Sequence, residues 1–107
     1  ITRVNYMKKG AVKQFAIVDA GMTDLIRPAL YDAVHKTINL TSDEPEQLYD
    51  VVGPICESSD VFVKDIKLNA VRRGDIIAML SAGAYGEIMA SQYNCRRLPE
   101  SYSSDEI

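Results

Sequence analysis

The sequence predicts a mainly β fold, a small Greek-key β-barrel or sandwich with a few short helical turns. Roughly five to seven short runs rich in β-branched and aromatic residues are spaced along the chain, and turn-forming residues separate them. The stretches with a helical pattern are all short. A length of 107 residues suits one domain, so residues 1–107 are expected to form a single unit.

The first two expected strands form a hairpin. Residues 2–8 alternate, with Val4 and Tyr6 on one face, and residues 13–21 form a compact apolar run that ends in glycine. Gly10 lies in the short polar connection between them, where a turn is expected.

Residues 22–35 change to a helical pattern, which Pro28 limits. Arg27, directly before the proline, is expected to be pushed out of the helical region of backbone space. Pro28 itself can open a helical turn. One or two short turns are therefore expected in this segment.

The rest of the chain alternates between further strands and turns. We expect a strand over 35–40, a polar acidic loop over 41–47 and a strand over 48–55 that is stopped by Gly-Pro. A further strand is expected to start at 61, and a turn at 72–75 leads to a buried strand over 76–82. Residues 83–94 are either a short helix or irregular, and a polar tail follows.

Composition excludes several classes of function. The net charge of −3 is dispersed along the chain, so no basic stripe is available for nucleic acid. No apolar run is long enough to cross a membrane, and the start of the chain lacks the apolar stretch of a signal peptide. We expect a cytoplasmic protein with reduced thiols, and the missing initiator methionine suggests a piece of a longer chain. One histidine and two cysteines without close spacing predict no metal site.

Arg27 and Tyr31 are the first candidate binding residues. A guanidinium can grip a carboxylate with two parallel hydrogen bonds, and a phenol four residues further along a helical turn lies on the same side. The residue types alone leave open a second interpretation, in which Arg27 is an ordinary surface residue and Tyr31 is half-buried.

Cys56 and Glu57 follow Pro54 in a polar loop. A nearby carboxylate holds a thiol protonated, which suits a proton donor better than a nucleophile. The alternative is that Cys56 is a small buried packing residue, as many cysteines are. Cys95 has no comparable setting and is assigned that packing role.

Tyr85 lies between glycines, which allow the backbone to approach a ligand closely. Its hydroxyl could contact a phosphate or a carboxylate. The spacing matches neither a Walker loop nor a dinucleotide-binding motif. His35 is interpreted as a structural residue.

Four segments together resemble one known family. Residues 17–35 (IVDAGMTDLIRPALYDAVH), 50–60 (DVVGPICESSD), 74–80 (GDIIAML) and 82–94 (AGAYGEIMASQYN) are similar, in order and spacing, to the C-terminal domain of the diaminopimelate decarboxylase family. These enzymes belong to the pyridoxal-phosphate decarboxylases with an alanine-racemase-like fold. Ser59 stands where family members commonly have glycine.

The resemblance implies a homodimeric enzyme that converts meso-diaminopimelate to L-lysine and CO₂ in lysine biosynthesis. An N-terminal (β/α)₈ barrel, absent from this chain, would carry the lysine that binds pyridoxal 5′-phosphate. Matched position by position, Arg27 and Tyr31 would bind substrate, and Glu57 would contact the substrate of the opposite subunit. Cys56 would be the proton donor, and Tyr85 would touch both substrate and cofactor. The chain alone is expected to be inactive.

Two alternatives remain at this stage. One is a domain of a sibling decarboxylase of the ornithine, arginine or carboxynorspermidine type. Such relatives usually place aspartate after the cysteine and need no guanidinium for a distal carboxylate, so Glu57 with Arg27 favours diaminopimelate. The other is a free-standing β module without catalytic activity.

Overall fold

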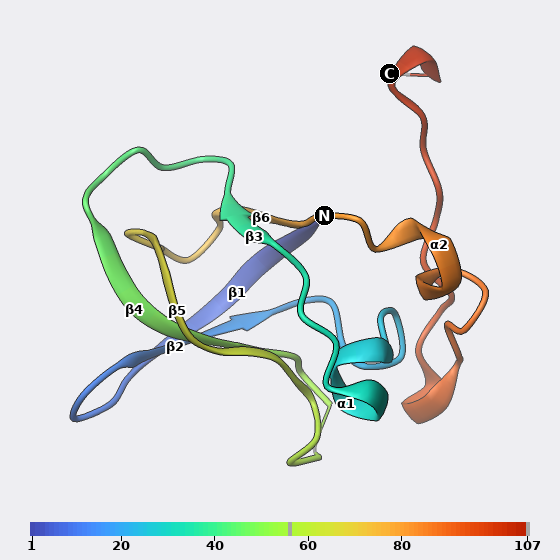
Figure 1. Ribbon diagram of the computed structural model, residues 1–107, viewed down its shortest axis with the longest axis horizontal. Helices are drawn as coiled ribbons and strands as arrows, with labels where there is room; N and C mark the ends of the chain where they lie inside the picture. The colour runs from blue at the N-terminus through green and yellow to red at the C-terminus, as the bar shows by residue number, and fades with distance from the viewer. Residues whose placement is uncertain (56, 107) are drawn as a thin grey trace.

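The computed structural model describes residues 1–55 and 57–106, and its main feature is one strongly curved sheet (Figure 1). Within these residues the strands are β1 (Thr2–Lys9), β2 (Gln14–Val18), β3 (Thr37–Asn39), β4 (Glu46–Val52), β5 (Val61–Asn69) and β6 (Ile76–Met79). The short helical pieces are α1 (Arg27–Tyr31), α2 (Gly83–Gly86), η1 (Tyr93–Cys95) and η2 (Ser104–Glu106).

The predicted hairpin of β1 and β2 is confirmed. The two strands pair antiparallel, and the N–H of Gly10 donates to the carbonyl of Lys13 at 2.9 Å to close the turn. The register shifts between Val4 and Tyr6, which is a β-bulge in β1. The bulge bends β1, so that its first residues can pair with β6 on the other side.

The sheet is nearly closed, in the order β3-β6-β1-β2-β4-β5. All neighbours pair antiparallel except β2 and β4, which are parallel. A side chain connects the two edge strands, because Nδ2 of the buried Asn39 donates to the carbonyl of Asn69 at 3.2 Å. The predicted mainly β, barrel-like fold with few short helices is therefore confirmed.

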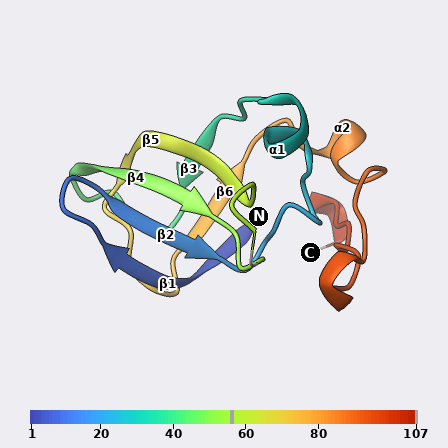
Figure 2. The same cartoon turned by 90° about the horizontal axis from the view of Figure 1, so that it is seen from below.

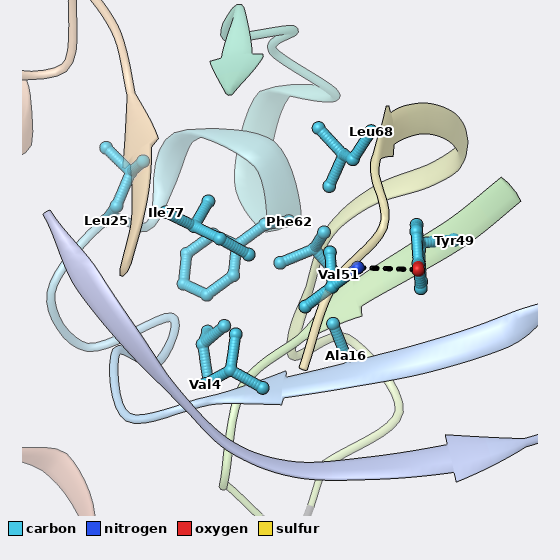
Figure 3. Close-up of a cluster of buried hydrophobic side chains, with 10 residues drawn as sticks. Val4, Ala16, Leu25, Tyr49, Val51, Phe62, Leu68 and Ile77 are labelled. Carbon is cyan, nitrogen blue, oxygen red and sulfur yellow. Dashed lines mark hydrogen bonds between the residues drawn. The ribbon is translucent and has the colours of Figure 1, made fainter. Parts of the chain in front are cut away.

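The core lies inside the curve of the sheet, where side chains from alternate positions of the strands meet (Figure 3). Its buried members are Val4, Ala16, Val18, Leu25, Tyr49, Val51, Phe62, Leu68, Val71 and Ile77. Tyr49 is the largest fully buried side chain, and its hydroxyl accepts a hydrogen bond of 2.7 Å from the N–H of Val71.

Replacing Tyr49 with phenylalanine should lower the free energy of unfolding by about 1–3 kcal/mol, because the buried N–H of Val71 then loses its acceptor. Urea-induced unfolding followed by circular dichroism measures this change. Tyr6→Phe is the matched control, since Tyr6 is 58% exposed and should tolerate the loss of its hydroxyl. If the two variants have the same free energy of unfolding, the hydroxyl of Tyr49 does not stabilise the folded state.

The structure differs from the sequence prediction at α1 and at the bounds of several strands, since β3, β4 and β6 end before the predicted residues 40, 55 and 82. The helix α1 begins at Arg27, which was expected to be excluded from it. Pro28 follows within the first turn, where its missing N–H has no intrahelical partner to lose, and the N–H of Leu30 bonds the carbonyl of Ile26 at 2.9 Å. The strand β4 begins at Glu46, inside the segment predicted as loop, because β5 pairs with it there.

The helices and the chain after β6 lie together at one end of the sheet. Figure 2 shows β1, β2, β4 and β5 side by side, with α1, α2 and the C-terminal segment gathered beyond them. None of the helices in the described ranges has the length and apolar character that crossing a bilayer requires. Arg27 and Tyr31 in α1 and Tyr85 in α2 therefore lie at this end of the molecule.

Candidate functional site

Arg27 lies against two tyrosine rings, one from each of two separate segments. Its guanidinium carbon is 5.4 Å from the centre of the Tyr31 ring and 5.7 Å from the centre of the Tyr85 ring. Both distances suit a cation–π contact. We call these three residues the arginine cluster. Tyr31 lies on the same side of α1 as Arg27, as the four-residue spacing predicts.

Tyr85 reaches the cluster through an unusual backbone conformation. Ala84 (φ −64°, ψ 127°) and Tyr85 (φ 64°, ψ −31°) have the angles of a type II turn, whose second central position normally holds glycine. A tyrosine with positive φ is strained, and such strain often marks a functional position. Because the ring remains 67% exposed, burial does not explain why tyrosine stands there.

The arginine cluster has the chemistry of an anion-binding site. None of the ion pairs within the described residues involves Arg27, so its N–H groups are available for a ligand. A guanidinium presents these donors in a planar fork that matches a carboxylate. The tyrosine rings restrict where the guanidinium can point, and their hydroxyl groups add further donors and acceptors.

The loop that holds Glu57 is fixed by Asp60, which is only 2% exposed. One carboxylate oxygen accepts from the N–H of Ile55 at 2.6 Å, and the other accepts from the N–H of Met22 at 2.7 Å. Burial raises the pKa of Asp60 above its ordinary value, and these two N–H donors oppose the shift. We call residues 53–60 the cysteine loop. Cys56 itself lies outside the described residues.

Gly53 closes the other side of this loop. Its N–H donates to the backbone carbonyl of Asp60 at 2.9 Å, and a Cβ at this position would collide with both carboxylate oxygens of Asp60. The two residues are therefore packed against each other without room for a side chain.

Gly53→Ala should lower the free energy of unfolding by about 1–3 kcal/mol, because the added methyl group forces the Asp60 carboxylate away from its N–H partners. Gly83→Ala serves as the matched control, since an added Cβ there meets open space. Both variants can be compared by thermal unfolding. The packing argument is contradicted if the two changes in melting temperature are the same.

Glu57 is exposed and accepts a hydrogen bond through Oε1 from the hydroxyl of Tyr93. This bond and the negative charge of Glu57 raise the pKa of the Tyr93 phenol above its ordinary value. The structure thus joins Glu57 to a residue that sequence reasoning missed. Tyr93 lies in one of the segments that carry the family resemblance, but nothing local in the sequence indicates its partner.

The connection between β2 and α1, residues 19–26, anchors both neighbouring segments. The N–H of Ser91 donates to the carbonyl of Thr23 at 2.8 Å, and Nη2 of Arg96 donates to the carbonyl of Asp19. The N–H of Met22, in the same connection, donates to the carboxylate of Asp60 in the cysteine loop. Asp60 and Arg96 were also missed from the sequence, because a hydrogen bond to a distant segment, such as that of Asp60 to Met22 or of Arg96 to Asp19, leaves no local pattern.

Two grooves flank these residues. The first, of about 480 Å³, lies between α1 and the cysteine loop, with Pro28 and Val34 on one side and Ser58 and Phe62 on the other. The second, of about 450 Å³, is lined by residues that include Gly83, Tyr85, Ile88 and Leu98. Both volumes fall in the range that small-molecule sites occupy.

The other candidates have simpler surroundings. Nδ1 of His35 lies 3.1 Å from the carbonyl of Leu80, which fits the structural role expected for it. Cys95 is exposed, contrary to the packing role assigned from the sequence. The residues that the structure describes contain no group of three or more His, Cys, Asp or Glu placed to hold a metal ion.

Residues 1–83 match the model of a known family, the C-terminal sheet domain of pyridoxal-dependent decarboxylases. The chain is 70% identical over 107 residues to a diaminopimelate decarboxylase of Bacteroides thetaiotaomicron, covering all of this chain and 28% of that protein.

Solved structures with the same fold include two enzymes crystallised with L-lysine. A diaminopimelate decarboxylase of M. jannaschii matches with a TM-score of 0.85 and 41% identity, over 89% of this chain and 22% of that one. The Helicobacter pylori enzyme matches with a TM-score of 0.81 and 54% identity, over 89% of this chain and 23% of that one. The chain spans about a quarter of the length of these relatives.

Proposed function

The chain belongs to the pyridoxal-dependent decarboxylases, as their C-terminal sheet domain, and from this membership we propose that it is the C-terminal part of a diaminopimelate decarboxylase. The full-length enzyme converts meso-diaminopimelate to L-lysine and CO₂, as a step of lysine biosynthesis in the cytoplasm. The high identity to a decarboxylase of this specificity supports the proposal. So does the presence of L-lysine in the complexes of two relatives.

Pyridoxal 5′-phosphate is the cofactor that this proposal requires. The described residues fit its anionic part, because Tyr85 presents an exposed hydroxyl beside a groove and an added Cβ at Gly83 would meet open space. Tyr85 would hold the edge of the cofactor. When bound, the cofactor supplies an electron sink for the electrons left behind by the departing CO₂. The lysine that carries it is assigned to an N-terminal barrel of the alanine-racemase-like type, outside this chain.

The arginine cluster would hold the end of the substrate that does not react. Diaminopimelate carries a second amino-acid group at its far end, with one carboxylate and one ammonium. Arg27 would grip the carboxylate with two charge-assisted hydrogen bonds, and the hydroxyl of Tyr31 would add a third contact. Glu57 would accept from the ammonium. An amino acid without the distal carboxylate would leave Arg27 unpaired.

Glu57 and Cys56 would act across a subunit interface, from the partner of a homodimer. Exposed apolar side chains around the candidate residues support an interface at this end of the molecule, including Leu30, Val34 and Ile88. Surfaces of this kind are normally covered by another domain or another subunit. We propose that the N-terminal barrel and the partner subunit bury these apolar side chains in the full-length enzyme.

Cys56 would complete the reaction as an acid. The carbon that loses CO₂ takes the proton of the Cys56 thiol, and the thiolate then regains a proton from solvent. Cys56 is described here by sequence alone. On either side of it the structure describes a buried Ile55 and an exposed Glu57.

The observation that carries the proposal is the guanidinium of Arg27, which lies against two exposed tyrosine rings and forms no ion pair with any of the described residues. It is tested by measuring CO₂ release from meso-diaminopimelate with pyridoxal phosphate, for this chain and for the full-length protein. We expect release from the full-length protein only. Release from L-ornithine or L-lysine in place of meso-diaminopimelate would contradict the proposed specificity.

A further inference from the structure

The hydrogen bond between Tyr93 and Glu57 joins residues that are 36 positions apart. Tyr93 is 51% exposed and Glu57 is exposed, so neither side chain is placed by burial in the core. Exposed side chains lose rotamer freedom when they pair, and such pairs contribute little to folding stability. Folding stability therefore explains little of this contact between two distant segments.

Both residues are carried by segments that are themselves anchored. The cysteine loop is tied through Asp60 to the N–H of Met22, and the segment before Tyr93 is tied by the N–H of Ser91 to the carbonyl of Thr23. Both anchors lie in the same connection between β2 and α1. The backbone segments that carry Glu57 and Tyr93 are thus both attached to residues 19–26. This attachment keeps the two side chains within hydrogen-bonding distance of each other.

We propose that Tyr93 is a positioning residue, whose hydroxyl holds Oε1 of Glu57 and so directs the second carboxylate oxygen, Oε2, toward the distal ammonium of the substrate. This inference rests on the function proposed above for Glu57. It assigns to the hydroxyl a role in substrate affinity, and none in the chemical step.

The geometry leaves the carboxylate suited to this task. A carboxylate offers two oxygens and about four acceptor directions, and the tyrosine occupies a direction on one oxygen only. Holding one oxygen reduces the rotational freedom of the exposed glutamate before substrate arrives. Less side-chain conformational entropy is then lost when substrate binds, which is the general effect of preorganisation.

The test is the kinetics of Tyr93→Phe in the full-length enzyme. We expect KM for meso-diaminopimelate to rise by about 2- to 12-fold, the effect of one hydrogen bond, with kcat changed less than about 2-fold. Tyr102→Phe is the matched control, because its hydroxyl also bonds a carboxylate, that of Glu100, only two residues away in the tail. KM should be unchanged in this control.

A double-mutant cycle shows whether Tyr93 acts through Glu57. In a Glu57→Gln enzyme, adding Tyr93→Phe should raise KM no further, because the residue that it positions is already altered. A further rise equal to that in the wild-type background would overturn the inference. So would an unchanged KM in Tyr93→Phe when Glu57→Gln alone raises KM, and that result would leave the proposed function intact.

A spectroscopic measurement tests the contact without any activity. Titration of ¹³Cζ-labelled tyrosine by NMR, with the Tyr93 signal assigned by Tyr93→Phe, should give a pKa for Tyr93 above the ordinary value, returning toward that value in Glu57→Gln. No change on Glu57→Gln would overturn the inference. If this signature is present but Glu57→Gln leaves KM unchanged, the proposed role of Glu57 fails, and the positioning role of Tyr93 fails with it.

Discussion

Replacing Arg27 with alanine is expected to lower kcat/KM for meso-diaminopimelate by about 10³-fold, because two charge-assisted hydrogen bonds worth roughly 1.5–3 kcal/mol each are lost. The guanidinium belongs to no ion pair of the described residues, so its removal breaks no salt bridge there. The folded state loses the contacts of the guanidinium with the rings of Tyr31 and Tyr85. Steady-state kinetics of the full-length enzyme measure the effect.

The variant Arg27→Lys distinguishes the contribution of the positive charge at this position from that of the planar guanidinium. Lysine keeps the positive charge but loses the planar fork, so its kcat/KM should fall between those of the wild type and Arg27→Ala. Arg73→Ala is the control, since Arg73 is an exposed arginine in the turn between β5 and β6. Retention of more than half of the wild-type kcat/KM by Arg27→Ala would exclude Arg27 from substrate binding.

Cys56→Ala should lower kcat by about 10²- to 10⁴-fold, the usual contribution of a positioned proton donor. KM should change little, because the thiol is proposed to act after substrate is bound. Measuring CO₂ release and L-lysine formation separately locates the defect. Loss of L-lysine yield with continued CO₂ release would point to the protonation step.

Cys95→Ala is the matched control for this prediction, since Cys95 is the exposed second cysteine of the chain and has no proposed role. Its kcat should equal that of the wild type. If Cys56→Ala also turns over at the wild-type rate, the proton comes from another group. The polar character of the cysteine loop would then need a different explanation.

Much of the fold follows from local sequence. The hairpin of β1 and β2, the short helix at Pro28 and the end of β4 before Gly53 are all determined by patterns within a few residues. The position of Arg27 inside α1 was predicted wrongly, because the preference of a residue before proline is weak enough for the first turn of a helix to override it.

The site was predictable only in part. The four-residue spacing of Arg27 and Tyr31 predicts their contact, since both belong to one helical turn. The approach of Tyr85 depends on a positive φ that tyrosine rarely adopts, and on the path of the chain between α1 and α2. The pairing of Glu57 with Tyr93 similarly requires two distant segments to be placed in three dimensions.

The pairing of β1 with β6 has a consequence for how this domain is made. Strand β1 is among the first residues of the domain to leave the ribosome, yet one of its two neighbours, β6, is synthesised about 70 residues later. Until then the amide edge of Thr2 and Arg3 stays open to other nascent chains. An unpaired strand edge can pair with the edge of another chain, so this edge of β1 is protected only after most of the domain has been synthesised.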